Sequence, residues 1–280
     1  MFDKQAVENF YDNYGMKEWE RLDATAYGKL LFHNHFEFMK PFIGINKKVL
    51  DAGCGPGRFS IEMAKAKCNV TLLDLSSHQL ELAKLKCRET DLMSFIDGFI
   101  HSSVTDMREI NDNTFDIAVC YGAVLNYLHE DTDNAIKELI RVTKNGGTIL
   151  ISVNSRFGVL KGCATELQFP LINFWGKSDL WGIYEVIKTG NEPDYPGAKH
   201  PKRHFFNANE ILELLNKNNL KDILLGAAPA LMTGLRANAE KLYKDKASWE
   251  TILYTEKSMY LNQNLADNGE FLLARATVMK

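Results

Sequence analysis

The sequence predicts an α/β fold built on a doubly wound, parallel β-sheet. From residue 47 onward, short apolar segments alternate with segments of helical spacing, which is typical of parallel strands joined by crossover helices. The segment 115–121 is almost entirely apolar, as expected of a strand that is covered on both faces. Such sheets bind ligands beyond the carboxyl ends of their strands, where the strand order reverses.

The predicted elements follow in order along the chain. Residues 1–40 show helical spacing of apolar side chains, and Pro41 ends this run. Ser76 and Gln79 have the spacing of a capping box at the start of a helix, and Asn145-Gly146-Gly147 is typical of a left-handed helix end. We expect strands over 48–51, 70–74, 95–101, 115–121 and 148–153, and helices over 59–66, 76–88 and 131–144.

The alternation breaks after residue 154. Residues 155–206 hold no clear long helix but many aromatic side chains, and 181–188 alternates like a strand. Asn207 and Glu210 have capping-box spacing and predict a helix to about residue 216. A strand over 221–226, helical segments around 234–262 and a closing strand over 270–278 follow. We interpret 155–206 as an insertion after the fifth strand.

Length and composition narrow the class of protein. A chain of 280 residues with 45% hydrophobic and 25% charged side chains is typical of a globular protein with a sizeable core. A net charge of -3 argues against a duplex-binding protein. The five cysteines lack C-x-x-C spacing, which argues against zinc and disulfides. With no signal peptide and no apolar run of about 20 residues, we expect a cytoplasmic protein without a membrane span.

A glycine-rich turn follows the first strand, with the sequence Asp51-Ala52-Gly53-Cys54-Gly55-Pro56-Gly57. Glycines permit a tight turn and a close approach of the backbone to a ligand, and the following helix start offers free N–H groups. A dinucleotide site would need a glycine at position 58, which is Arg58. The segment instead resembles motif I, D-x-G-x-G-x-G, of the class I S-adenosylmethionine-dependent methyltransferases, and it matches at every position.

The resemblance covers residues 47–153 and implies a Rossmann-like, seven-stranded sheet that binds S-adenosyl-L-methionine. It implies that Asp74 binds the ribose hydroxyls, since a carboxylate accepts two hydrogen bonds from a diol. Leu75 would lie against the adenine, and Asp106 would contact its amino group. The segment 114–121 resembles motif IV, which lies near the sulfonium. The cofactor-binding residues implied are Asp51, Gly53, Cys54, Gly55, Gly57, Asp74, Leu75, Thr105, Asp106, Met107, Cys120 and Tyr121.

The N-terminal segment resembles the helical lid of a subset of small-molecule methyltransferases. The candidate lid residues are Tyr11, Tyr14, Trp19 and Arg21. Arg21 is a candidate partner of the cofactor carboxylate, because guanidinium and carboxylate form strong charge-assisted hydrogen bonds. The alternative is an amphipathic helix that packs on the sheet and leaves the arginine solvated.

Methyl transfer from a sulfonium is an in-line displacement in which the enzyme positions the acceptor. An amine acceptor needs only to be neutral, whereas a hydroxyl usually needs a base. The catalytic candidates are His129 as a base and the hydroxyl groups of Tyr121 and Tyr127. The aromatic side chains of 155–206 fit an apolar pocket, although a satellite core is the alternative. The substrate-binding candidates are Trp175, Trp181, Tyr184, His200, His204 and Phe205.

The sequence therefore predicts methyl transfer to N or O of a small organic molecule. Base-methylating enzymes carry an N/D-P-P-Y/F motif after the fourth strand, where this chain has Cys120-Tyr121-Gly122-Ala123, so we expect no nucleic-acid partner. A protein or peptide methyltransferase and a non-catalytic S-adenosylmethionine-binding module stay open, and no metal is expected. We expect one domain, with a lid (1–45), a cofactor-binding core (46–154), a cap (155–206) and a segment that completes the sheet (207–280). The oligomeric state is not predicted.

Overall fold

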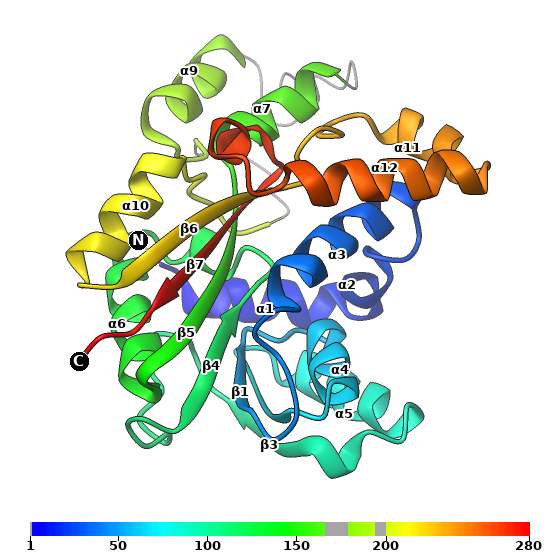
Figure 1. Ribbon diagram of the computed structural model, residues 1–280. Helices are drawn as coiled ribbons and strands as arrows, with labels where there is room; N and C mark the ends of the chain where they lie inside the picture. Colours follow the sequence, from blue (N-terminus) through cyan, green and yellow to red (C-terminus); the bar gives the residue numbers. More distant parts are fainter. Residues whose placement is uncertain (1, 166–178, 194–199) are drawn as a thin grey trace.

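The computed structural model describes residues 2–165, 179–193 and 200–280. These residues form a seven-stranded sheet with helices on both faces (Figure 1). The strands are β1 (Lys48–Ala52), β2 (Asn69–Asp74), β3 (Ile96–His101), β4 (Phe115–Cys120), β5 (Thr143–Asn154), β6 (Lys221–Ala228) and β7 (Phe271–Thr277). The helices are α1 (Lys4–Tyr14), α2 (Met16–Glu20), α3 (Ala26–Met39), α4 (Arg58–Lys65), α5 (Ser77–Glu89), α6 (Thr132–Val142), α7 (Arg156–Thr165), α9 (Asp179–Thr189), α10 (Ala208–Lys217), α11 (Arg236–Tyr243) and α12 (Lys246–Met259).

The strand order confirms the predicted doubly wound fold. The strands lie in the order β3-β2-β1-β4-β5-β7-β6, and the pairs among β1 to β5 are parallel. The chain builds outward from β1 to β3 and then crosses back to β4 on the other side of β1. The switch point of the sheet therefore lies between β1 and β4, where ligands of such sheets bind.

The predicted parallel arrangement is confirmed for β1 to β5 and does not extend to β7, which pairs antiparallel with both β5 and β6. The chain between β6 and β7 stays at one edge of the sheet. At the end of α12, the carbonyl of Tyr260 accepts a hydrogen bond from the N–H of Ala227 near the end of β6 (2.9 Å). Strand β7 starts at the end of the sheet where β6 finishes, so it has to run in the opposite direction.

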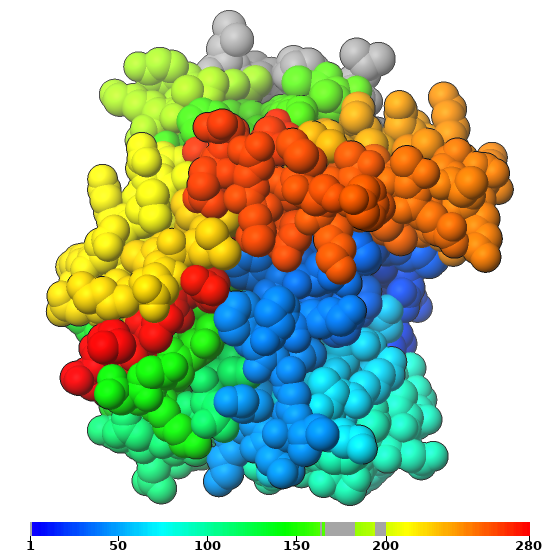
Figure 2. Space-filling view, in the orientation of Figure 1, coloured from blue at the N-terminus to red at the C-terminus, as the bar shows by residue number. Residues whose placement is uncertain are grey.

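The helices cover the two faces of the sheet in two separate cores. Helices α3, α4 and α5 pack on one face with apolar residues such as Leu30, Met63 and Leu80. Helices α6 and α10 pack on the other face through residues such as Ile136 and Ile211. Helices α11 and α12 both pack against α3, and in Figure 2 the orange atoms of this C-terminal segment border the blue atoms of the N-terminal part.

Two predicted elements differ in the structure. The segment 181–188 belongs to helix α9 and is not a strand. Its apolar residues Ile183 and Val186 lie three positions apart, which places them on one face of a helix but on opposite faces of a strand, and both pack with Phe205. The glycine pair after α6 does not end that helix, because the chain is already extended at Thr143 and Gly146 donates its N–H to the carbonyl of Val278 (2.8 Å).

The expectation that 155–206 holds no clear long helix is wrong, because α7 and α9 lie in this segment. The expectations for the C-terminal elements are met closely. Asn207 and Glu210 form a complete capping box at the start of α10. The closing strand and the helices around 234–262 occur where they were expected. Within the described ranges, no helix combines the length and the hydrophobicity that a membrane crossing needs.

Candidate active site

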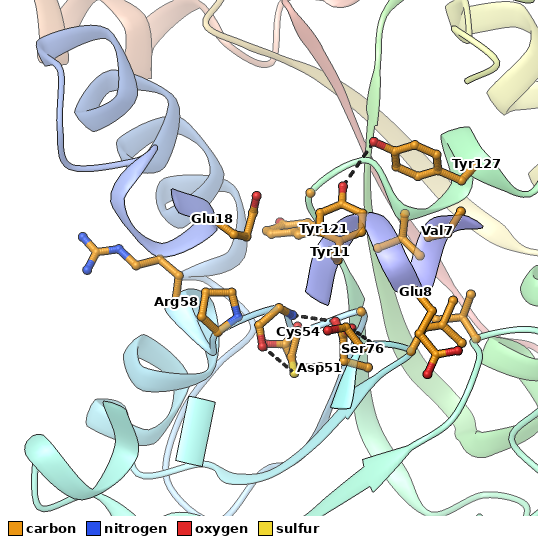
Figure 3. A pocket seen from close by; sticks show the side chains of 18 of the residues that line it. Val7, Glu8, Tyr11, Glu18, Asp51, Cys54, Arg58, Ser76, Tyr121 and Tyr127 are labelled. Atoms are coloured by element: carbon orange, nitrogen blue, oxygen red, sulfur yellow. Dashed lines mark hydrogen bonds between the residues drawn. The ribbon is translucent and has the colours of Figure 1, made fainter. Parts of the chain in front are cut away.

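A cavity opens at the switch point of the sheet, and the N-terminal helices cover it (Figure 3). Its floor is the glycine-rich turn after β1, and its sides are the chain after β2, β3 and β4. Helices α1 and α2 contribute residues from above. The lining residues are Phe2, Val7, Glu8, Tyr11, Glu18, Arg21, Leu22, Asp51, Gly53, Cys54, Gly55, Pro56, Arg58, Phe59, Asp74, Leu75, Ser76, Ser103, Val104, Tyr121, Gly122, Val124, Tyr127 and Leu128.

The glycine-rich turn is shaped by close packing that only glycine allows. Gly53 has φ +80°, and a Cβ there would lie 2.3 Å from Cγ2 of Val124 in the loop after β4. Gly57 has φ +81° at the start of α4, and a Cβ there would lie 3.2 Å from Ala83. The turn therefore exposes its backbone to the cavity and touches the loop after β4 directly.

Two buried carboxyl groups end the central strands at this cavity. Asp74 accepts hydrogen bonds from the N–H groups of Gly55 (2.7 Å) and Ser76 (2.8 Å), one at each oxygen. Burial raises the pKa of Asp74 to about 6, against the lowering effect of these two N–H donors. Asp51 accepts a hydrogen bond from the hydroxyl of Ser60 (2.5 Å), and burial raises its pKa to about 7. Both groups will ionise more readily when a cation is bound nearby.

Polar contacts to the start of α5 hold helix α1 over the carboxyl ends of the strands. The side-chain amide of Gln79 donates to the carbonyls of Tyr11 (2.9 Å) and Gly15 (3.1 Å). Ser76 Oγ donates to Asp12 (2.5 Å) and also accepts from the N–H of Gln79 (3.1 Å). The predicted capping box is thus only half correct, because the side chain of Gln79 holds α1 instead of bonding back to Ser76.

Helix α2 brings an ion pair into the cavity. Arg21 Nε donates to Glu18 Oε1 at 2.6 Å, and both side chains line the cavity. Burial works to lower the pKa of Arg21, but the charge and hydrogen bond of Glu18 outweigh it and raise this pKa. Trp19 points elsewhere, with the guanidinium of Arg58 at 4.8 Å and the ammonium of Lys86 at 5.1 Å from its ring centre. Trp19 therefore attaches the lid to α4 and α5.

The structure brings many, but not all, of the predicted cofactor-binding residues together. Those that line the cavity are Asp51, Gly53, Cys54, Gly55, Asp74, Leu75, Tyr121 and Arg21. The predicted residues that do not line it are Gly57, Thr105, Asp106, Met107, Cys120, Tyr14 and Trp19. Asp106 is turned outward, where both of its oxygens accept hydrogen bonds from Arg108 (2.7 and 2.8 Å). Ser103 and Val104 lie at the cavity in its place.

The catalytic candidates are separated by the structure. Tyr121 and Tyr127 line the cavity, and the hydroxyl of Tyr127 accepts a hydrogen bond from Tyr11 (3.2 Å). The hydroxyl of Tyr121 is buried and has no hydrogen-bond partner among the described residues. His129 lies in a second hollow outside this cavity, with Nε2 3.2 Å from the carbonyl of Lys202.

None of the predicted substrate-binding residues with a described side chain lines the cavity. Tyr184 is 59% exposed and Phe205 is fully buried in a small cluster with Val186. His204 lines the second hollow, and Nδ1 of His200 lies 3.8 Å from Glu192. Trp175 and the side chain of Trp181 lie outside the described residues.

The sequence prediction missed several residues that α1 and α2 bring to the cavity. Phe2, Val7 and Glu8 line it, as does Glu18. Two signals were available. Val7 and Tyr11 are four residues apart on one helical face, and Glu18 and Arg21 have the spacing of an ion pair on a helix. Neither signal shows which way the helix face points.

Comparisons with known proteins agree with this architecture. The profile of the methyltransferase domain family matches residues 49–147. The protein named methyltransferase YqeM of Bacillus subtilis is 31% identical over 201 residues, which cover 65% of this chain and 78% of that protein. A ubiquinone biosynthesis O-methyltransferase of Vibrio cholerae is 33% identical over 176 residues. That match covers 63% of this chain and 62% of the relative, so the chain spans less than two thirds of that protein.

Solved structures share the fold at low sequence identity. One is an S-adenosylmethionine-dependent methyltransferase of Thermotoga maritima, described as a possible histamine N-methyltransferase (TM-score 0.59, 16% identity, 97% of this chain and 99% of that one). Another is the 1,6-didemethyltoxoflavin-N1-methyltransferase of Burkholderia thailandensis (TM-score 0.56, 14% identity, 88% of that chain). With the sheet order, the glycine-rich turn and the similarity to YqeM, these findings show that the chain belongs to the class I S-adenosylmethionine-dependent methyltransferases. It is an enzyme whose cofactor is S-adenosylmethionine.

Proposed function

We propose that this enzyme transfers the methyl group of S-adenosylmethionine to N or O of a small organic molecule. The observation that carries the proposal is the cavity that α1 and α2 close over the glycine-rich turn and Asp74. A cavity between a sheet edge and a helical lid suits a small acceptor. The relatives support this choice, because the names of two of them specify a ubiquinone pathway and a toxoflavin precursor.

The residues present fit the cofactor. Each oxygen of Asp74 keeps a lone pair beyond its backbone hydrogen bond, so the carboxylate is able to accept from a ribose diol. We assign the adenine to the apolar side of the cavity, between Leu75, Val104 and Leu128. This assignment replaces the one to Asp106, whose carboxylate is engaged by Arg108. Arg21 is the proposed partner of the cofactor carboxylate.

When bound, S-adenosylmethionine supplies a methyl group on a positively charged sulfur, which the acceptor N or O attacks in line. We place this point near Gly122, where the chain leaves β4 and Arg21 comes close. Tyr121 is held there by edge-to-face contacts with His35 (5.3 Å) and Phe59 (5.2 Å). We propose that these contacts fix the wall along which the acceptor approaches, and that Tyr121 and Tyr127 orient it. His129 is not retained as the base, because it lies in the other hollow.

The same proposal assigns roles to the segments of the chain. Residues 1–45 form the lid over the cofactor, and 46–154 form the cofactor-binding core. The described parts of 155–206, which are 155–165, 179–193 and 200–206, form a cap at the carboxyl edge of the sheet, and 207–280 complete the sheet. Support for the lid comes from the hydrogen bonds between α1 and α5 described above.

The test combines an acceptor screen with a binding measurement. The enzyme is incubated with S-adenosylmethionine and panels of small amines, phenols and other hydroxyl compounds, and release of S-adenosylhomocysteine is followed. Release with a small acceptor, together with a mass gain of one methyl group on it, is the expected result. Turnover with peptides alone would contradict the proposal.

Asp74→Asn tests the cofactor site independently of the acceptor. An amide nitrogen cannot accept a hydrogen bond, so we expect S-adenosylhomocysteine to bind about 10- to 100-fold more weakly in calorimetry. Asp97→Asn is the matched control, because Asp97 is an exposed residue of β3 away from the cavity. Equal affinity of the Asp74 variant and the wild type would remove the ribose assignment.

A further inference from the structure

The Glu18–Arg21 ion pair places two opposite charges at the cavity. Each side chain keeps polar atoms that are not bonded within the pair. Only Nε of Arg21 bonds to Glu18, so the two Nη groups have no partner among the described residues. The second carboxylate oxygen of Glu18 likewise has no hydrogen-bond partner within the described ranges. The side chain of Glu18 is 15% exposed and that of Arg21 is 28% exposed, so both are largely shielded from water.

The two charged groups lie over two different parts of the cavity floor. The nearest atom to a Cβ built on Gly55 is Cγ of Glu18, at 3.5 Å. The nearest atom to a Cβ built on Gly122 is Nη2 of Arg21, also at 3.5 Å. Glu18 therefore lies above the glycine-rich turn, and Arg21 lies above the chain that leaves β4.

We propose that Glu18 is a specificity-determining residue that binds the α-ammonium group of the cofactor, while Arg21 binds the α-carboxylate. The amino-acid end of the cofactor carries one positive and one negative charge on neighbouring atoms. An ion pair with a free carboxylate oxygen and two free Nη groups matches this arrangement, and each charge gains an opposite partner. The ion pair thus selects ligands that carry a complete amino-acid end. This inference rests on the proposed position of the cofactor over the glycine-rich turn.

The charges along the cavity agree with this assignment. The acids that line it are Glu8, Glu18, Asp51 and Asp74, and the permanent cations that line it are Arg21 and Arg58. Arg58 is already paired with Asp23 (2.5 Å). Acids therefore outnumber cations in the lining, and a ligand with an ammonium group suits it.

The test measures the binding of three ligands that differ only at the amino-acid end. S-adenosylhomocysteine carries both charges, its decarboxylated analogue carries the ammonium group only, and 5′-methylthioadenosine carries neither. We expect Glu18→Gln to lower the affinity for S-adenosylhomocysteine and for the decarboxylated analogue about 10- to 100-fold. The affinity for 5′-methylthioadenosine should stay within about 2-fold of the wild-type value. Arg21→Gln should lower the affinity for S-adenosylhomocysteine alone. Glu20→Gln is the control, because Glu20 is exposed on the same helix and does not line the cavity.

Each alternative outcome has a definite meaning. Unchanged binding of S-adenosylhomocysteine to Glu18→Gln would overturn the inference. An equal loss for 5′-methylthioadenosine would also overturn it, because Glu18 would then act on the ribose or on the folding of the lid. Retained binding of 5′-methylthioadenosine shows that the variant is folded. A wild-type enzyme that bound none of the three ligands would instead contradict the proposed cofactor site.

Discussion

Asp51 and Asp74 are acids whose pKa values depend on what the cavity contains. Burial raises the pKa of Asp51 to about 7 and that of Asp74 to about 6 in the ligand-free protein. The N–H donors on Asp74 and the hydroxyl on Asp51 moderate this effect without cancelling it. Both groups therefore change protonation close to neutral pH.

The affinity for the cofactor should consequently depend on pH. A bound ammonium group favours the ionised acids and lowers their pKa values, so binding at pH 6 releases protons. We expect affinity to be constant above about pH 8 and to fall as pH decreases below 7, by at most roughly tenfold per pH unit for each group. Calorimetry with S-adenosylhomocysteine from pH 8 to pH 5 measures this.

Asp51→Asn provides the control for this pH dependence. The variant lacks the group with the higher pKa, so its affinity should respond to pH only at lower values, where Asp74 titrates. A wild-type affinity that stayed constant between pH 8 and pH 5 would show that neither acid changes protonation on binding.

At the scale of elements, Glu256 of α12 connects its own helix to α3 and to the chain at 230–232. Its two carboxylate oxygens accept hydrogen bonds from the N–H groups of Ala230, Leu231 and Met232 (2.6–3.0 Å). The side-chain amide of Asn34 on α3 donates a fourth (3.0 Å). Glu256 is fully buried, so each of these donors depends on it.

Glu256→Gln should therefore destabilise the whole fold. The amide group presents an NH₂ where a carboxylate oxygen accepted two hydrogen bonds, so at least one buried backbone N–H loses its partner. We expect the free energy of unfolding to fall by about 2–4 kcal/mol, measured by urea denaturation. Glu250→Gln, on the exposed side of the same helix, should change it by less than about 0.5 kcal/mol. Equal stability of the two variants would contradict this role.

At the scale of the whole molecule, the bound cofactor should stabilise the lid in its position over the sheet. Gln79 holds α1 through two carbonyls, and α1 in turn covers the cavity. Gln79→Ala removes both side-chain hydrogen bonds from α5 to the lid, so the two carbonyls keep only their backbone partners within the lid, the N–H groups of Gly15 and Glu18. We expect faster proteolysis within residues 1–22 and about 10-fold weaker binding of S-adenosylhomocysteine. Glu81→Ala, at an exposed position of α5, is the matched control.

The wild-type protein should show the complementary effect. S-adenosylhomocysteine should protect residues 1–22 from proteolysis and leave cleavage elsewhere unchanged, because its proposed contacts join α1 and α2 to the core. A lid that was cut at the same rate with and without ligand, in both proteins, would contradict the assignment of residues 1–45.

Local signals in the sequence were sufficient for most of the cofactor-binding core. The D-x-G-x-G-x-G turn requires backbone conformations that glycine provides, and strands buried on both faces show as apolar runs. The family, the cofactor and the positions of Asp51 and Asp74 at strand ends could therefore be predicted before any contact was known. Asp106 could not be assigned in this way, because its neighbour Arg108 turns it outward.

The sequence by itself thus determined the doubly wound sheet, the glycine-rich turn and the acids that follow β1 and β2, since neighbouring residues fix each of these features. The tertiary structure alone decided which side chains of α1 and α2 face the cavity, that Gln79 fastens α1, and that Trp19 packs against Arg58 and Lys86. It also decided that β7 runs antiparallel, because α12 returns the chain to the edge where β6 ends. These features depend on contacts between segments far apart in the chain, and such contacts leave no pattern in the residues on either side.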